Sequence, residues 1–163
     1  MATTADLNGT TYSIPQSGET GNGDDLTTYL VAVASAGSGI LQFGNSATPS
    51  GAGTTYLHPG FAPATTSAGT EIKVRVPAAG KISNLYVQCT GGSTGGNIVL
   101  TVRANGSDTT ITTTLAAAAT QGADTSHTST VTAGTAISVK VVAGGGTSAG
   151  AANLVATLLF TPS

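Results

Sequence analysis

The sequence predicts an all-β fold: an antiparallel jelly-roll sandwich of about seven to eight strands, preceded by an N-terminal arm that contains one short helix. Apolar and polar residues alternate along short segments, and glycine-rich turns separate these segments about every 8–12 residues. Asn105-Gly106 joins two such segments, and a type I′ hairpin turn favours this pair because both of its central residues need positive φ. Only 7% of the residues are charged, and Gly, Ala, Thr and Ser replace Lys and Glu. This composition is typical either of a threonine-rich β surface or of a chain that is packed in an assembly, where mutual burial replaces charge.

The first predicted region is an arm over residues 1–37. Residues 10–14 read as a short strand that ends at Pro15. The next segment favours a short helix with Asp24 or Asp25 as its cap and Gly37 as its stop. One helical face then carries the apolar residues at spacing i, i+3, i+4 and i+7, namely Leu26, Tyr29, Leu30 and Val33. A strand is the alternative here, because Tyr, Val and Thr also favour sheets.

The second predicted region, residues 38–70, is an extended, loop-rich connector. Residues 39–44 and 54–60 are short possible strands set in Ser, Ala, Gly and Thr. Proline removes a donor from a strand, so Pro49, Pro59 and Pro63 predict that this region avoids the centre of a sheet. Long ordered loops usually serve function or assembly.

The third predicted region, residues 71–163, is the β-sandwich. Alternation of apolar residues predicts strands over 72–76, 82–89, 98–103, 109–115, 126–132, 136–143 and 153–161. A loop containing Asp124 is expected before the fifth of them. The last strand is apolar on both faces, because Val155 and Leu159 accompany its inner set. We therefore expect a neighbouring chain to cover Val155 and Leu159.

The charge pattern argues against two classes of partner. The formal net charge is −2, and the five basic residues form no basic run. Neither nucleic-acid binding nor polybasic attachment to a membrane surface is expected. No apolar run reaches the roughly 20 residues that cross a bilayer, and residues 1–12 lack the features of a signal peptide, so synthesis in a cytoplasm is expected.

The residues with chemical potential have structural explanations. Cys89 alternates with Leu85 and Val87 and reads as a small buried apolar residue. Asp124 and His127 lie three residues apart, but no second carboxylate or base is expected to converge on them. Asp24 and Asp25 suit helix capping, with a calcium site as the alternative. The chain is therefore not expected to be an enzyme, and no metal or cofactor is predicted.

Two stretches resemble known families. The run GKISNLYVQCTGG…NIVLTVRANGSDTTITTTL, followed by VTAGTAISVKVVAGG, resembles C1q/TNF-type jelly-roll modules at the ends of bacterial and phage surface proteins. The stretch NGTTYSIPQSGETGNGDDLTTYLVAVAS resembles a segment of tailed-phage virion proteins, in which a Tyr-x-x-Pro-x-x-Gly strand and turn precede a short helix. Tyr12, Pro15 and Gly18 keep that outline, whereas Asn22 replaces an aromatic residue common in the family.

The resemblance implies a structural virion protein made in the host cytoplasm: a capsid decoration (cement) protein that binds the major capsid protein as a homotrimer and stabilises the phage head. The expected contacts are Tyr12, Ile14, Pro15, Tyr29 and Leu30 in the arm, with Val155 and Leu159 between subunits. The alternative is a tail-fibre or receptor-binding module that recognises a host surface glycan or protein.

Overall fold

A computed structural model describes residues 3–7, 10–14, 37–46, 53–61, 71–144 and 151–163. Within these residues the chain is all-β, which confirms the predicted class. Two short strands, β1 (Thr3–Leu7) and β2 (Thr10–Ile14), form an antiparallel hairpin of their own. The predicted helix between Asp25 and Gly37 lies outside the described residues, so it stays a prediction.

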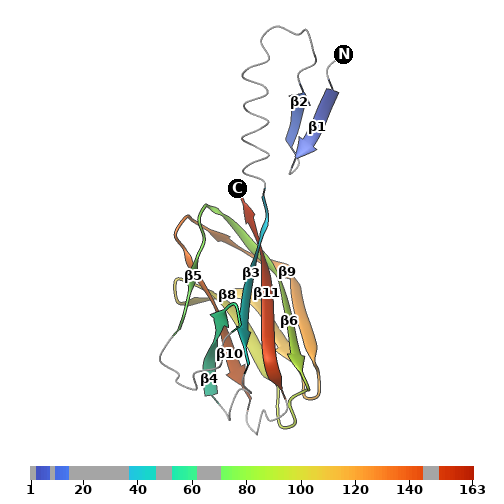
Figure 1. Ribbon diagram of the computed structural model, residues 1–163, viewed down its shortest axis with the longest axis vertical. Coiled ribbons are helices and arrows are strands. Elements are labelled where there is room, and N and C mark those ends of the chain that lie inside the picture. The colour runs from blue at the N-terminus through green and yellow to red at the C-terminus, as the bar shows by residue number, and fades with distance from the viewer. Residues whose placement is uncertain (1–2, 8–9, 15–36, 47–52, 62–70, 145–150) are drawn as a thin grey trace.

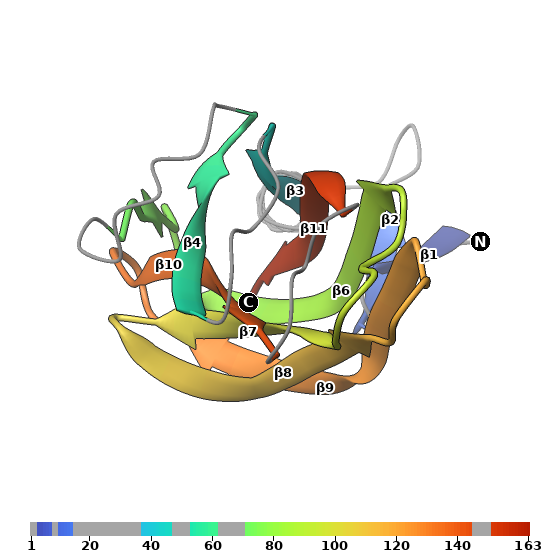
Figure 2. The same cartoon turned by 90° about the horizontal axis from the view of Figure 1, so that it is seen from below.

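Nine further strands form one antiparallel sheet that wraps into a nearly closed sandwich (Figures 1 and 2). In chain order they are β3 (Gly39–Asn45), β4 (Gly53–Pro59), β5 (Val74–Arg75), β6 (Gly80–Thr90), β7 (Ile98–Ala104), β8 (Ser107–Leu115), β9 (Gln121–Val131), β10 (Ala136–Ala143) and β11 (Ala152–Pro162). The order across the sheet is β8-β7-β10-β4-β3-β11-β6-β9, and β5 also pairs with β10. The two end strands of this path, β8 and β9, lie side by side (Figure 2).

The core lies between two layers, one made of β4, β10, β7 and β8 and the other of β3, β11, β6 and β9. Alternate residues of each strand point into it, which confirms the inward sets predicted for the strands at 98–103, 136–143 and 153–161. Its largest side chains without solvent exposure include Phe43, Ile82, Leu85, Leu100, Ile111, Ile137 and Leu154. Burial of these apolar surfaces drives the two layers together.

The turn between β7 and β8 has the conformation that its sequence predicts. Asn105 has a φ of 51° and Gly106 a φ of 84°, as a type I′ turn requires. The turn is also joined to β10: the Asn105 backbone N–H donates to the Ala136 carbonyl at 2.8 Å, and the Ala136 N–H donates to Asn105 Oδ1 at 2.9 Å. The asparagine therefore fixes the position of the turn as well as its shape.

Two local expectations were wrong. The sheet has nine strands rather than seven or eight, since β3 and β4 lie at its centre although prolines were expected to keep them out. Pro59 is tolerated because it is the last residue of β4, beyond the residues that pair with β10. Asp124 was expected in a loop but lies within β9, beside a register shift opposite Asn84 of β6, whose φ is 52°.

Candidate functional site

Most charged side chains among the described residues gather over the layer of β7, β8 and β10. Arg103 is at the centre: its Nη1 lies 2.9 Å from Glu71 Oε1 and 3.1 Å from the Tyr56 hydroxyl, and its Nε lies 2.9 Å from Asp108 Oδ1. Lys140 pairs with Asp108 as well. The charges of this cluster are paired with one another, so the cluster holds strands together and presents no unpaired charge to a ligand.

Hydrogen bonds and charges keep both carboxyls of this cluster ionised. Burial raises the pKa of Glu71. Hydrogen bonds from Ser138 and Lys73, together with the charge of Arg103, lower this pKa by a larger amount, so the net shift is downward. The hydrogen bond from Lys140 is the main cause that lowers the pKa of Asp108. Both groups therefore remain negative partners for Arg103 at neutral pH.

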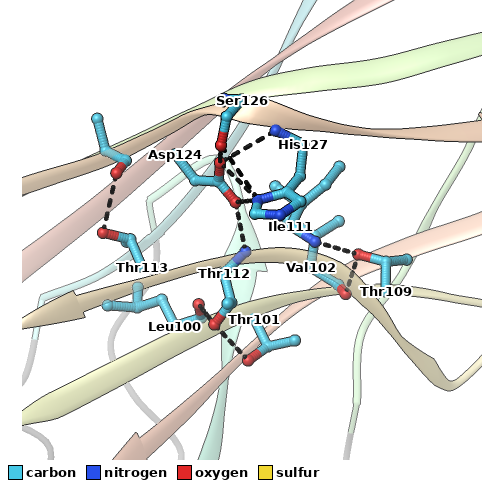
Figure 3. A network of polar contacts seen from close by, with 11 residues as sticks. Leu100, Thr101, Val102, Thr109, Ile111, Thr112, Thr113, Asp124, Ser126 and His127 are labelled. Carbon is cyan, nitrogen blue, oxygen red and sulfur yellow. Dashed lines mark hydrogen bonds and ion pairs between the residues drawn. The ribbon is translucent and has the colours of Figure 1, made fainter.

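A second polar cluster surrounds the carboxylate of Asp124 at the seam between β8 and β9 (Figure 3). Oδ2 accepts a hydrogen bond from the backbone N–H of Thr112 on β8 at 2.9 Å. Oδ1 accepts from the backbone N–H groups of Ser126 and His127 at 3.1 and 3.2 Å, and from Ser126 Oγ at 3.0 Å. His127 Nδ1 lies 2.9 Å from Oδ2. One buried side chain thus ties the two end strands of the sheet together.

This cluster contains Ser, His and Asp but lacks the arrangement of a nucleophilic relay. In such a relay the serine contacts one ring nitrogen of the histidine and the carboxylate contacts the other. Here Ser126 Oγ and both oxygens of Asp124 lie on the same nitrogen, His127 Nδ1. The carboxylate of Asp124 instead holds backbone N–H groups of β8 and β9 in place, so its role is structural.

A hollow lies on the outer face of the other layer, where strand register aligns the outward side chains in rows. One row runs Gln121, Gln88, Val155 and Gly44 across β9, β6, β11 and β3. The next row runs Ala123, Tyr86, Thr157 and Gln42. Together these rows span three strand spacings of about 4.8 Å each.

The residues of these rows on β9, β6 and β11, together with Phe61, line a groove of about 710 Å³, here called the outer-face groove. Its lining residues include Phe61, Tyr86, Gln88, Thr90, Gln121, Ala123, Asn153, Val155 and Thr157. Phe61 covers Gly44, since a Cβ on that glycine would lie 2.7 Å from Phe61 Cδ2. Gly44 contributes no side chain to this face of β3. The ring of Phe61, two residues beyond the end of β4, lies there instead.

Exposed apolar side chains concentrate on this face. Tyr86 is 54% exposed and Phe61 52% exposed, and Ile40 at the start of β3 is 74% exposed. Only one other large apolar residue of the described chain, Ile72, is comparably exposed. Ile40 pairs across the sheet with Leu159 and lines a smaller hollow of about 200 Å³ beside Tyr86. Gathered apolar exposure of this kind marks an interaction surface.

The structure brings together only part of the predicted site. Val155 and Leu159 lie half-buried on the outer face of β11, Val155 in the outer-face groove and Leu159 in the smaller hollow. Tyr12 and Ile14 lie on β2, while Pro15, Tyr29 and Leu30 lie outside the described residues. Sequence reasoning missed the aromatic and amide groups of the groove. Tyr86 was available as a signal, because it is an aromatic residue at an outward position between the inward Leu85 and Val87.

Neither a cluster of metal-binding side chains nor a membrane-spanning helix is found among the described residues. The described part of the chain contains no cluster of three His, Cys, Asp or Glu residues that could hold a metal ion. Cys89 is buried as predicted, and burial raises the pKa of its thiol. None of the described residues belongs to a helix long and apolar enough to span a membrane.

Comparison with known proteins adds a distant likeness of fold. No family model matches the chain, and no curated protein matches it. Among solved structures, a family 35 carbohydrate binding module from Clostridium thermocellum is similar over 76% of this chain and 92% of its own, with 15% sequence identity and a TM-score of 0.38. A likeness at this level carries no argument about function. The residues of the outer-face groove therefore carry the functional interpretation.

Proposed function

We propose that this chain is a non-catalytic recognition module displayed on a phage particle, where it binds a host surface glycan or protein. The supporting observation is the outer-face groove, an uncharged hollow that gathers exposed aromatic and amide side chains on a rigid sheet. Binding sites are typically concave and largely apolar, with a few placed polar groups. The assignment to a phage particle rests on the resemblance of the N-terminal segment to tailed-phage virion proteins.

The expected result is saturable binding of the purified chain to intact host cells, together with a low copy number on the particle. The measurement is fluorescence of cells incubated with the labelled protein, with quantification of the chain in purified particles. A copy number that matches the capsid lattice, without binding to cells, would overturn the recognition role.

A capsid decoration protein is the second candidate function. One observation favours it: Ile40 and Leu159 pair as a short apolar strip across β3 and β11, as a subunit contact would need, and Val155 lies farther along the same face of β11, beyond Thr157. A homotrimer that binds only the assembled shell of the major capsid protein would stabilise that shell by mass action. Stoichiometric co-purification with heads would support this function over recognition of a host.

Leu159→Asp tests the subunit contact. If the strip joins subunits, the aspartate places an uncompensated charge in an apolar interface, and the oligomer is expected to dissociate to monomers. Light scattering coupled to gel filtration measures the mass. The matched control, Thr114→Asp on the exposed side of β8, is expected to keep the native mass. An unchanged mass for Leu159→Asp would remove this strip from the interface.

A further inference from the structure

We propose that the outer-face groove binds a neutral oligosaccharide, with Tyr86 and Phe61 as stacking platforms and the amides of Gln88 and Gln121 as the hydrogen-bonding groups. This inference rests on the proposed recognition function and assigns its ligand class. Each part of the groove supplies one of the interactions that an uncharged sugar chain needs.

The two aromatic residues lie at different strands of one continuous surface. Tyr86 stands on β6, and Phe61 lies over Gly44 of β3. Between them β11 contributes Val155 and Thr157, which are half-buried and small enough to leave the groove open. The apolar C–H face of a pyranose ring packs on an aromatic ring, so two rings separated along a groove suit a chain of sugars rather than a single sugar.

Amide side chains border this surface on neighbouring strands. The β6–β9 register places Gln88 opposite Gln121, and both side chains are exposed. Asn153 adds a third amide, whose Nδ2 donates to Thr90 Oγ1 at 3.3 Å. An amide offers donors and an acceptor together. This combination matches adjacent sugar hydroxyls, each of which also donates and accepts.

The charge distribution selects neutral sugars. None of the residues that line the groove is charged. Arg103 and Lys140 are engaged in ion pairs over the opposite layer, and so cannot serve the groove. An acidic sugar in the groove would lose water around its carboxylate or sulfate without gaining a cationic partner among the lining residues. A second copy of the chain is the alternative occupant, and the oligomer mass of Tyr86→Ala distinguishes it from a sugar.

The test is an array of neutral oligosaccharides of hexoses and N-acetylhexosamines, with sialylated and sulfated chains of matched length. We expect the wild-type chain to bind neutral chains in preference to acidic ones. Tyr86→Ala should weaken binding at least about tenfold, and Tyr86→Phe should keep most of it because the ring remains. Gln88→Ala should weaken binding severalfold. Thr114→Ala on the opposite layer is the matched control and should bind as the wild type does. The unfolding midpoint of each variant shows that its fold is intact.

Three results would overturn the proposal: no binding of the wild type to any neutral chain, a preference for acidic chains, or equal binding by Tyr86→Ala. A loss of oligomer mass in Tyr86→Ala would instead assign the face to a second copy. The outcomes also separate the two proposals. Host-cell binding that survives Tyr86→Ala would support the recognition function but show that the groove does not carry it. Binding to the array without binding to host cells would support the sugar site in the groove but contradict the recognition function.

Discussion

Asp124→Asn is expected to lower the free energy of unfolding by about 2–3 kcal/mol, although the new side chain has almost the same size. The carboxylate accepts hydrogen bonds at both oxygens, including the Thr112 N–H on β8 and the His127 N–H on β9. An amide keeps one acceptor and turns an NH₂ group toward donors on the other side. One buried backbone N–H is then left unpaired at the seam. Urea denaturation followed by circular dichroism measures the change.

The control for this prediction is His127→Ala. The His127 side chain is 54% exposed, so removal of the ring should cost less than about 1 kcal/mol. Equal losses of unfolding free energy in Asp124→Asn and His127→Ala would show that the Asp124 carboxylate is not what stabilises the contact between β8 and β9.

The same carboxylate predicts how stability depends on pH. Burial raises the pKa of Asp124, but hydrogen bonds from Thr112, His127 and Ser126 lower it more, so the folded pKa lies well below the usual range. A depressed folded pKa means that this stabilisation is complete above the unfolded pKa of about 4 and is lost as the pH falls below that value. The difference in stability between the wild type and Asp124→Asn should therefore shrink from pH 5 toward pH 2, as read from urea titrations at each pH.

Gly92→Ala is the second substitution with a large expected effect, about 3 kcal/mol of lost stability. Gly92 lies in the loop between β6 and β7, where a Cβ would come within 2.3 Å of the Cα and carbonyl carbon of Ala118. Backbone atoms cannot rotate away as a side chain can. Ala118 lies in the loop between β8 and β9, and a hydrogen bond from its N–H to the Ser93 carbonyl at 2.9 Å joins that loop to the loop of Gly92. A methyl group would separate them, and the unfolding midpoint in urea should fall.

Gly53→Ala is the matched control, because a Cβ on Gly53 in β4 would meet no atom within 4 Å. Its stability should change by less than about 1 kcal/mol, and an increase is consistent with the smaller conformational freedom of alanine in the unfolded chain. If Gly92→Ala behaves like Gly53→Ala, the close approach of the two loops is wrong.

Scaffold and surface are separated in this molecule. Ion pairs around Arg103 lie over one layer, and the carboxylate of Asp124 closes the seam between β8 and β9. The outer-face groove lies on the other layer and contains neither device. Substitutions in the groove should therefore change binding while leaving the fold intact, which makes Tyr86 and Gln88 suitable positions to test.

The candidate site was only partly predictable from the sequence. An exposed apolar face on the last strand was visible, since Val155 and Leu159 interrupt the expected polar positions, and the structure places both on the outer face of β11. The partners of that face were not visible. Phe61 reaches it from a segment expected to be a loop, and Gln121 reaches it from a segment expected to precede its strand. Such neighbours depend on which strands pair, and alternation along one segment carries no information about its partner.

The sequence by itself determined the all-β class, the inward set of most strands and the Asn105-Gly106 turn, because period-two alternation and positive φ are local requirements of the chain. Only the tertiary structure decided the strand order, the place of β3 and β4 at the centre, and the role of Asp124 between β8 and β9. These depend on contacts between residues far apart in the chain. The outer-face groove belongs to the same category, since β6, β9 and β11 must align, with Phe61 beside them, before its side chains share one surface.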